Sequence, residues 1–474
     1  MSEDAVALIV LAAGMGSRMN SRLPKPLHPV AGEPMLWRVL RAAAACRPRS
    51  ATVVLSREIA DHPAWRAADL SVSVAIQKSP LGTGDAVRCA LPEVGEARWL
   101  LVLFADHPLL TPDTVIRLIA GAEAQAAKVT VLTCLLDDAG TYGRIERDAR
   151  GRVVRVVERK EDRPDARQGR VEINSGMMVL DAAWARLALP RIEPSALTGE
   201  YYLPELVRLA AADPDPEDRW PVATVVGAEQ DLLGVNDRVE LARADSILRG
   251  RIRTRHMLAG VTLIAPEQIV IDEDVEIGAD TTIHPFSVLE AGTRIGSGCE
   301  IGPFASLRGA RIEDGARVLA STVVEAALGR GADAGPYAHL RAGTTVGPDA
   351  HVGNFAEIKN SELGAGSRVG HFSYVGDATV GERANIGAGT VTCNFDGVGK
   401  HRTAIGKDAF IGSGTMLVAP VSVGDFGRTG AGSVVIRDVA AGTTVVGVPA
   451  RPLAARGSRA PSDNTARPDG GGKH

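Results

Sequence analysis

The chain has few cysteines, no large excess of either charge and no apolar run long enough to span a bilayer. Its five cysteines are scattered without paired spacing, so we expect neither a disulfide framework nor a thiolate zinc site, and a reducing cytoplasm fits best. A formal net charge of -4 excludes a strongly basic surface for nucleic acid or an anionic membrane. The apolar residues 5–13 are too few for a membrane span. These absences favour small molecules as partners.

The first half of the chain has the pattern of an α/β domain. A length of 474 residues exceeds what one hydrophobic core usually supports, so at least two domains are expected. Up to about residue 228, apolar runs alternate with helical stretches, which predicts a mostly parallel sheet with helices on both faces. Such sheets bind ligands at the carboxyl ends of their strands. The expected strands are 6–11, 51–55, 72–76, 99–104 and 129–135, and the clearest helices are 35–46 and 114–127.

The second half has a different period. A connecting helix is expected over 237–257, where Asp237 and Glu240 have capping-box spacing. From about residue 260 an apolar residue returns at every sixth position, which predicts a parallel β-helix with these residues inside a prism. The repeat contains Ile271, Ile277, Ile283, Leu289, Ile295, Ile301 and Leu307, and resumes with Leu340, Val346, Val352, Ile358, Leu363, Val369, Val375, Val380, Ile386, Thr392, Ile405, Ile411, Leu417 and Val423.

Two segments depart from this period. Residues 393–404 are too many for one turn and are expected to leave the prism as a loop. After about residue 455 the chain is rich in Gly, Pro, Ser, Arg and Asp and is expected to be disordered. The predicted organisation is a first domain at 1–228, a linker at 229–258, a repeat domain at 259–455 and a tail at 456–474.

A glycine turn, LAAGMGSRM, directly follows the first expected strand. Gly14 and Gly16 allow backbone amides to approach a polyanion, while Arg18 and Lys25 supply positive charge for phosphates. A tight turn with two solvated cations would give the same pattern. Asp106 follows the fourth strand, where a carboxylate could hold a magnesium ion against triphosphate oxygens or could simply cap a helix.

The repeat frame of the second half predicts an outward patch of charged residues. Three hexapeptides close one coil, so Arg341 and Lys359, eighteen residues apart, should stack at about 4.8 Å. Two such cations repel by about 1 kcal/mol when solvated, and an anion would remove that repulsion. Two solvated surface cations are the alternative. Glu357 and Tyr374 lie in the neighbouring column, and His371 lies near a corner within reach.

Taken in order, the motifs LAAGMGSRM, QKSPLGTGDA, YGRI, VERK, INSG, GVNDR, GHFSY and NIGAGTVTCNFDGVGK resemble those of a known family. It is the family of bifunctional N-acetylglucosamine-1-phosphate uridylyltransferases and glucosamine-1-phosphate acetyltransferases, and the likeness covers about residues 5–450. The resemblance implies a Rossmann-like α/β nucleotidyltransferase domain, a linking helix and a left-handed parallel β-helix of hexapeptide repeats. It also implies a cytoplasmic homotrimer whose adjacent prisms share acetyltransferase grooves, and a role in cell-wall and lipopolysaccharide synthesis.

The resemblance implies two transfers that together make UDP-N-acetylglucosamine. Acetyl-CoA acetylates glucosamine 1-phosphate, and UTP then transfers its uridylyl group to N-acetylglucosamine 1-phosphate with release of pyrophosphate. The second transfer needs Mg²⁺ but no protein nucleophile, because the sugar phosphate itself attacks the α-phosphorus of UTP. No nucleic acid or membrane partner is implied.

The resemblance also assigns site residues in the first domain. Gly14, Arg18 and Lys25 would bind and polarise the UTP phosphates, and Asp106 and Asn236 would hold the magnesium. From the residues alone, Asn236 could equally be a plain helix-start residue. The other implied contacts to UTP and the sugar nucleotide are Leu11, Gln77, Gly82, Thr83, Gly143, Glu158 and Asn174.

In the second domain, His371 is implied as the base that takes a proton from the sugar amine, with Glu357 orienting or assisting it. The implied contacts to glucosamine phosphate are Arg341, Lys359, Tyr374, Asn385 and Lys400, and those to acetyl-CoA are Ala388, Asn394, Phe395, Ser413 and Ala431.

Five positions depart from the family's usual residues. Pro80 replaces a common glutamine near the base, and Phe104 and Ala105 replace tyrosine and glycine before the metal aspartate. Phe395 replaces a tyrosine, and Gly447 stands where some members have an arginine.

Two other functions are open from the residues alone. The chain could be a nucleotidyltransferase of other specificity with a non-catalytic β-helix, or a nucleotide sensor on a trimerisation scaffold. Neither of these would need His371, Glu357, Arg341 and Lys359 in one patch.

Overall fold

The computed structural model describes residues 6–14, 16–66, 71–140, 142–213 and 219–453. Two compact units divide the chain, Met1–Ile252 and Arg253–His474, and the boundary falls inside helix α8 (Arg238–Leu258). The tail predicted to be disordered at 456–474 lies outside the described residues. No helix in the described part of the chain is long and apolar enough to cross a membrane.

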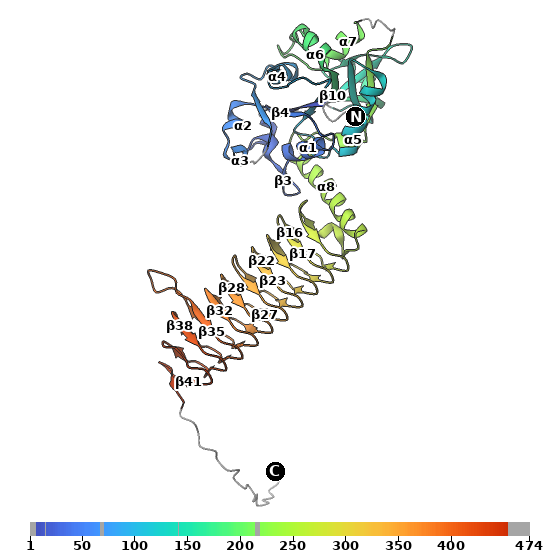
Figure 1. Ribbon diagram of the computed structural model, residues 1–474. Coiled ribbons are helices and arrows are strands. Elements are labelled where there is room, and N and C mark those ends of the chain that lie inside the picture. The colour runs from blue at the N-terminus through green and yellow to red at the C-terminus, as the bar shows by residue number, and fades with distance from the viewer. Residues whose placement is uncertain (1–5, 15, 67–70, 141, 214–218, 454–474) are drawn as a thin grey trace, which may run out of the picture. The chain divides into compact units, whose positions relative to one another are not determined.

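A mixed sheet forms the centre of the first unit (Figure 1). Its described strands have the order β11-β7-β10-β6-β1-β4-β5, and β8 and β9 extend it beside β10. The run β6-β1-β4-β5 is parallel, as the alternation of strands and helices predicts. These strands are β1 (Val6–Leu11), β4 (Ser50–Leu55), β5 (Ser73–Ile76), β6 (Trp99–Phe104), β7 (Val129–Asp138), β8 (Gly143–Arg147), β9 (Val153–Val157), β10 (Gln168–Asp181) and β11 (Val222–Val226).

Strand β10 is the main feature of this sheet that the sequence pattern does not predict. It runs antiparallel to both β6 and β7, and it shifts register between Asn174 and Met178. Its first half pairs with β7, and Ile173 and Asn174 also pair with β8, which in turn pairs with β9. The irregular step brings Asn174 to the edge of a pocket described below.

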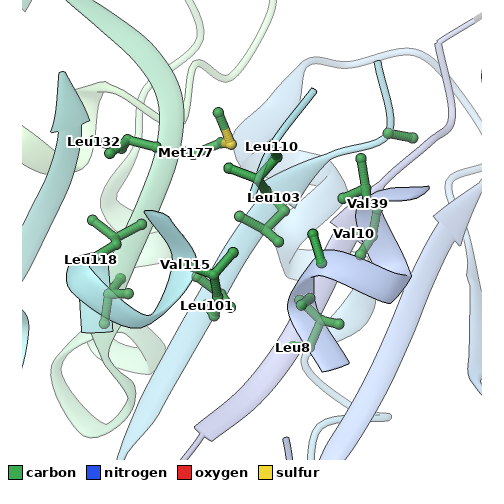
Figure 2. Packing of buried hydrophobic residues seen from close by; sticks show 14 of the residues in the cluster. Leu8, Val10, Val39, Leu101, Leu103, Leu110, Val115, Leu118, Leu132 and Met177 are labelled. Carbon is green, nitrogen blue, oxygen red and sulfur yellow. The ribbon is translucent and has the colours of Figure 1, made fainter. Parts of the chain in front are cut away.

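Successive residues of β1 and β6 point to opposite faces of the sheet, so the sheet has a core on each side. Figure 2 shows one face, where Leu8 of β1 and Leu101 of β6 pack with Val39 of α1 and Val115 of α5. The opposite face packs residues such as Val102 against the other helices. The helices of this unit are α1 (Met35–Ala44), α2 (Arg57–Asp61), α3 (Pro63–Arg66), α4 (Thr83–Ala90), α5 (Pro112–Gln125), α6 (Ala182–Ala188) and α7 (Glu205–Ala211).

The second unit is a left-handed parallel β-helix, whose coils run from yellow to red in Figure 1. Its three sheets are built from short strands between β12 (Thr262–Leu263) and β42 (Arg451–Pro452). The inward residues of the six-residue step are buried, except Ile277 in the first coil, which is partly exposed. The repeat also continues where the sequence pattern lost it, through buried Ile312, Val318, Val323, Leu328 and Ala334. Some of these steps are five residues long, which hides the period.

The predicted loop leaves the prism between β34 (Val391–Cys393) and β35 (Thr403–Ile405). In the coils just before this point, strand partners lie seventeen residues apart, as Glu357 and Tyr374 do. Across it, Thr379 pairs with Ala404, twenty-five residues later. The extra residues form the loop, which an isolated bridge between Phe395 and Lys400 closes. We call residues 394–402 the extruded loop.

Substitution of Leu340 by Ala should destabilise the β-helix. Leu340 is fully buried, so the cavity should lower the free energy of unfolding of this unit by about 2–5 kcal/mol. The partly exposed Leu319 is the matched control, and its replacement by Ala should have an effect below about 1 kcal/mol.

Urea unfolding can be followed separately for the two units. Far-ultraviolet circular dichroism detects the β-helix, whereas fluorescence detects only the first unit, since all five tryptophans lie there. The dichroism transition should move for Leu340→Ala while the fluorescence transition stays in place. A shift in fluorescence alone would contradict the assignment of Leu340 to an independent core.

Candidate functional site

The first candidate site is a pocket beyond the carboxyl ends of β1 and β6. Parallel pairing sets Leu11 beside Phe104, so the glycine turn after β1 and Asp106 after β6 leave the sheet together. Its lining contains six of the residues predicted for UTP, together with Asp106 and three departures from the family pattern. These are Leu11, Gly14, Lys25, Gln77, Gly82 and Thr83, with Pro80, Phe104 and Ala105, and with Glu200 and Tyr202, which sequence reasoning missed.

Two glycines in this region allow close approaches that a side chain would block. Gly16 has a left-handed backbone, with φ of 66°, and a Cβ there would lie 2.5 Å from Cβ of Lys25. Gly82 also has positive φ, and its Cβ would lie 2.7 Å from the carbonyl oxygen of Tyr201. Gly16 therefore lets Lys25 turn into the pocket, and Gly82 lets the start of α4 close against the Tyr201 backbone.

The ammonium of Lys25 lies between two acceptor oxygens from distant parts of the chain. Its Nζ is 2.5 Å from Oδ2 of Asp106 and 3.2 Å from Oδ1 of Asn236. Burial alone would raise the pKa of Asp106, but a hydrogen bond from His107 and the charge of Lys25 outweigh it. The pKa of Asp106 therefore lies well below its ordinary value, and the carboxylate stays ionised.

Other residues perform the capping roles that Asp106 and Asn236 could have had. The Thr111 hydroxyl accepts a hydrogen bond from the backbone N–H of Thr114 at the start of α5. At the start of α8, the Asp237 carboxylate accepts from the backbone N–H groups of Val239 and Glu240. The side chains of Asp106 and Asn236 are thus directed to the pocket rather than to helix ends.

The oxygens of Asp106 and Asn236 are suitable ligands for a hard cation such as Mg²⁺. Both groups offer oxygen, and they already converge on one positive charge. Within the described ranges, no cluster of three or more His, Cys, Asp or Glu residues could hold a metal by itself. A magnesium ion here would need further oxygen ligands from water or a substrate phosphate, which is its usual mode of binding.

A second pocket opens beside the first and shares Thr83, Asp106 and Tyr202 with it. It contains the residues predicted for the sugar, from β8, β10 and the segment after β9. Burial and the neighbouring Glu161 raise the pKa of Glu158, whose carboxylate faces Gly143 so closely that a Cβ there would lie 3.3 Å away. The predicted members are Arg18, Gly143, Glu158, Asn174 and Asn236, and the members that sequence reasoning missed include His107, Tyr142 and Ser175.

The structure places Arg18 differently from Lys25. Arg18 is exposed and lines the second pocket rather than the first. The two cations predicted to bind UTP phosphates therefore line different pockets, Lys25 the first and Arg18 the second.

The second candidate site lies on the β-helix, where three cations gather. Arg341 and Lys359 follow the stacked residues Leu340 and Ile358, as the repeat frame predicts. The positive charges of Lys400, from the extruded loop, and of Arg341 lower the pKa of Lys359. Such a cluster favours an anion, and the loop adds a cation that stacking alone would not bring there.

A buried carboxylate, Asp377, lies beneath these cations and was missed by sequence reasoning. Its oxygens accept hydrogen bonds from the amides of Asn360 at 2.6 Å and Asn394 at 2.5 Å. Burial would raise the pKa of Asp377, but these hydrogen bonds and the charges of Lys400 and Lys359 keep it below its ordinary value. Asn394 is thus held at the root of the extruded loop.

His371 has a different partner from the one expected. Its Nδ1 hydrogen bonds to Oδ1 of Asn354, which is its direct neighbour on the preceding coil. Glu357 instead accepts a hydrogen bond from Arg341 at 2.7 Å. These contacts do not include a hydrogen bond between Glu357 and His371, and the expectation that Glu357 orients or assists His371 stays a prediction. Asn354 lies seventeen positions before His371 and pairs with it in register, whereas Glu357 lies on the next sheet and pairs with Tyr374.

The remaining predicted residues lie in neighbouring columns of the prism. Tyr374 pairs in register with Glu357, and Asn385 lies on the adjoining sheet. Ala388, Ser413 and Ala431 each come two residues after a stacked inward residue, so they form one column of small side chains. Phe395 is exposed in the extruded loop, and Gly447 has a left-handed backbone, with φ of 96°.

Known proteins resemble the chain along almost its whole length. The family of MobA-like NTP transferase domains matches residues 8–173, and the family of bacterial transferase hexapeptide repeats matches residues 274–309. The bifunctional protein GlmU of Pelobacter propionicus is 42% identical over 94% of this chain and 96% of its own length. GlmU of Heliobacterium modesticaldum is 44% identical over 92% of this chain and 94% of its own. GlmU of Mycobacterium tuberculosis is 42% identical over 93% of this chain and 89% of its own length.

Both domain types and the near-complete coverage agree with the two sites described above. The chain belongs to the GlmU family of bifunctional proteins.

Proposed function

We propose that the two transfers of UDP-N-acetylglucosamine synthesis take place at two separate sites, uridylyl transfer in the first unit and acetyl transfer on the β-helix. The observation that carries this proposal is that each unit has its own polar site built for phosphate. One joins Lys25, Asp106 and Asn236 at strand ends, and the other joins the three cations beside His371. We propose domain limits of 1–228, 229–258 and 259–455.

In the first unit, the pocket with Gln77 and Gly82 would take the uridine and phosphates of UTP. The adjoining pocket with Glu158 and Asn174 would take N-acetylglucosamine 1-phosphate, so that its phosphate faces the α-phosphorus of UTP. Lys25 of the first pocket and Arg18 of the second would stabilise the charge that develops on the phosphates. Asp106 and Asn236 would hold Mg²⁺, which neutralises charge on the phosphates when it is bound.

In the second unit, the cluster of Arg341, Lys359 and Lys400 would bind the phosphate of glucosamine 1-phosphate. Because Oδ1 of Asn354 accepts a hydrogen bond, Nδ1 of His371 carries the proton and Nε2 holds the lone pair. Nε2 would take a proton from the sugar amine as the amine attacks the thioester of acetyl-CoA. The column of Ala388, Ser413 and Ala431 leaves room for the coenzyme, with Asn394 and Phe395 at its loop side.

A homotrimer is supported by exposed rings along one corner of the prism, which we call the aromatic ladder. It consists of two groups of stacked rings. Phe286 stacks on Phe304, and the ring centroid of Phe355 lies 5.3 Å from that of Tyr337 and 5.2 Å from that of Phe372. Phe355 and Phe372 directly follow Asn354 and His371, so a copy covering the ladder would border the acetyl-transfer site. The ladder contains Phe286, Phe304, Tyr337, Phe355 and Phe372, all more than half exposed. The five free cysteines fit a cytoplasmic protein.

Replacement of Asp106 by Ala should abolish uridylyl transfer and spare acetyl transfer. Loss of a charge contact in the transition state typically lowers the rate by about 100-fold or more. Pyrophosphate release from UTP and N-acetylglucosamine 1-phosphate measures the first activity, and thiol release from acetyl-CoA measures the second. Asp113→Ala, on the exposed side of α5, is the control and should keep both activities. Equal loss of both activities in Asp106→Ala would refute separate sites.

Replacement of His371 by Ala should have the reciprocal effect. Acetyl transfer should fall by about 100-fold to 10,000-fold because the general base is lost, while pyrophosphate release stays unchanged. The partly exposed His351 on the preceding coil is the control, since it pairs with Asp333. Unchanged acetylation kinetics in His371→Ala would remove this residue from the mechanism.

Replacement of Phe355 by Glu should weaken the assembly and acetyl transfer together. Phe355→Glu adds one carboxylate to each chain, and burying an unpaired charge in an interface carries a large desolvation cost, so the substitution should oppose association. Phe426→Glu is the control, because Phe426 is equally exposed on a left-handed turn but lies between β38 (Val421–Val423) and β39 (Arg428–Thr429), at another corner. Light scattering measures the mass of the assembly and so the number of chains in it. A trimer that survives Phe355→Glu, or one that Phe426→Glu disrupts equally, would contradict the ladder as the interface.

A further inference from the structure

The imidazole of His107 is a buried group beside the first site to which the proposed chemistry gives no role. It follows Asp106 directly, is only 6% exposed and lines the sugar pocket. Its Nδ1 is 3.0 Å from Oδ1 of Asp106. An ionised carboxylate can only accept, so Nδ1 must carry the hydrogen that is shared with Asp106.

The neighbours of this ring fix its orientation. Phe104 meets it edge to face, with ring centroids 6.1 Å apart and an interplanar angle of 66°. On the other side, a Cβ added to Gly234 would lie only 3.3 Å from Nε2 of His107. The imidazole is therefore held between the end of β6 and the segment that leads to Asn236, and it has little freedom to turn away from Asp106.

The other ring nitrogen argues against a purely structural role. Nε2 is buried, and no described residue forms a hydrogen bond with it. An apolar side chain of similar size would fill this space without burying an unpaired polar atom, which is destabilising. The imidazole is thus of use at this position mainly through Nδ1, which is the atom that faces Asp106.

The two oxygens of Asp106 have different partners as a result. Oδ1 accepts from His107, and Oδ2 is left to face the positive charge that Asn236 also faces. A carboxylate held by a hydrogen bond on one oxygen cannot rotate freely about its own axis. The backbone supports the same arrangement, since the carbonyl oxygen of Asp106 accepts a hydrogen bond from the N–H of Val235, next to Asn236.

We propose that His107 is a positioning residue that holds the Asp106 carboxylate so that Oδ2 and Oδ1 of Asn236 face one cation together. This inference rests on the proposed role of Asp106 and Asn236 as magnesium ligands. Groups that orient metal ligands in this way typically change metal affinity by about 10-fold to 100-fold when they are removed. His107 does not touch the substrate phosphates in this account and acts only through Asp106.

The test compares two substitutions of nearly equal shape in the full-length chain. In His107→Asn the side-chain amide can still donate to Oδ1 of Asp106, whereas His107→Leu has no donor. Mn²⁺ is the probe, because free Mn²⁺ can be titrated by electron paramagnetic resonance without any turnover. His107→Leu should weaken Mn²⁺ binding by about 10-fold to 100-fold, and His107→Asn should stay within about 3-fold of the unaltered protein.

Two further measurements separate positioning from a general loss of structure. Both variants should keep the native tryptophan fluorescence of the first unit, which reports that the unit containing His107 is folded, and acetyl transfer on the β-helix should be unchanged. His107→Met serves as a second variant without a donor and should match His107→Leu, so the comparison does not depend on a single substitution.

Asp106→Asn shows which assumption has failed if the result differs. If Asp106→Asn abolishes Mn²⁺ binding but His107→Leu and His107→Met bind as the unaltered protein does, the role of His107 is overturned and the metal site stands. If Asp106→Asn binds Mn²⁺ normally, the proposed metal ligands are wrong. Equal weakening in His107→Asn and His107→Leu would also overturn the inference, because the hydrogen-bond donor would then not matter.

Discussion

Parallel strand pairing is the constraint on which both sites depend. In the first unit it sets the end of β1 beside the end of β6, and so brings the turn with Lys25 to Asp106. In the second unit it stacks Leu340 on Ile358, and so places Arg341 and Lys359 in one outward column. Residues that are far apart in sequence thus meet because they occupy paired positions on neighbouring parallel strands, or directly follow the ends of such strands.

The balance of positive and negative charge then makes each site suitable for phosphate groups. Asp106 stays ionised because Lys25 and His107 stabilise its negative charge. Asp377 in the β-helix also stays ionised, because hydrogen bonds from Asn360 and Asn394 and the nearby lysine charges lower its pKa. Through Asn394 it also holds the root of the extruded loop. Both sites therefore combine fixed positive charge with a carboxylate that keeps it in place, which suits phosphate-bearing substrates.

The sequence pattern reached the architecture because strong periodicity survives small irregularities. It predicted the strands around Asp106, the six-residue prism and the extruded loop, since each produces a regular apolar spacing or interrupts one. It missed β10, which runs antiparallel within a sheet predicted to be mostly parallel, and the coils around Val323, where steps of five residues occur. It also gave no sign that Asn354 is the partner of His371, because the length of each coil sets which residues are lateral neighbours and the coil here has seventeen residues. His107 and Asp377 carry no motif, and only their buried contacts indicate a role.

The most direct test of two transfers at two sites is a reconstitution with single omissions. The chain is given glucosamine 1-phosphate, acetyl-CoA, UTP and Mg²⁺, and sugar products and pyrophosphate are measured as each component is left out. The account predicts that N-acetylglucosamine 1-phosphate still forms without UTP or Mg²⁺, while pyrophosphate release requires all four. Pyrophosphate release without acetyl-CoA, or acetylation that stops when UTP is omitted, would contradict it.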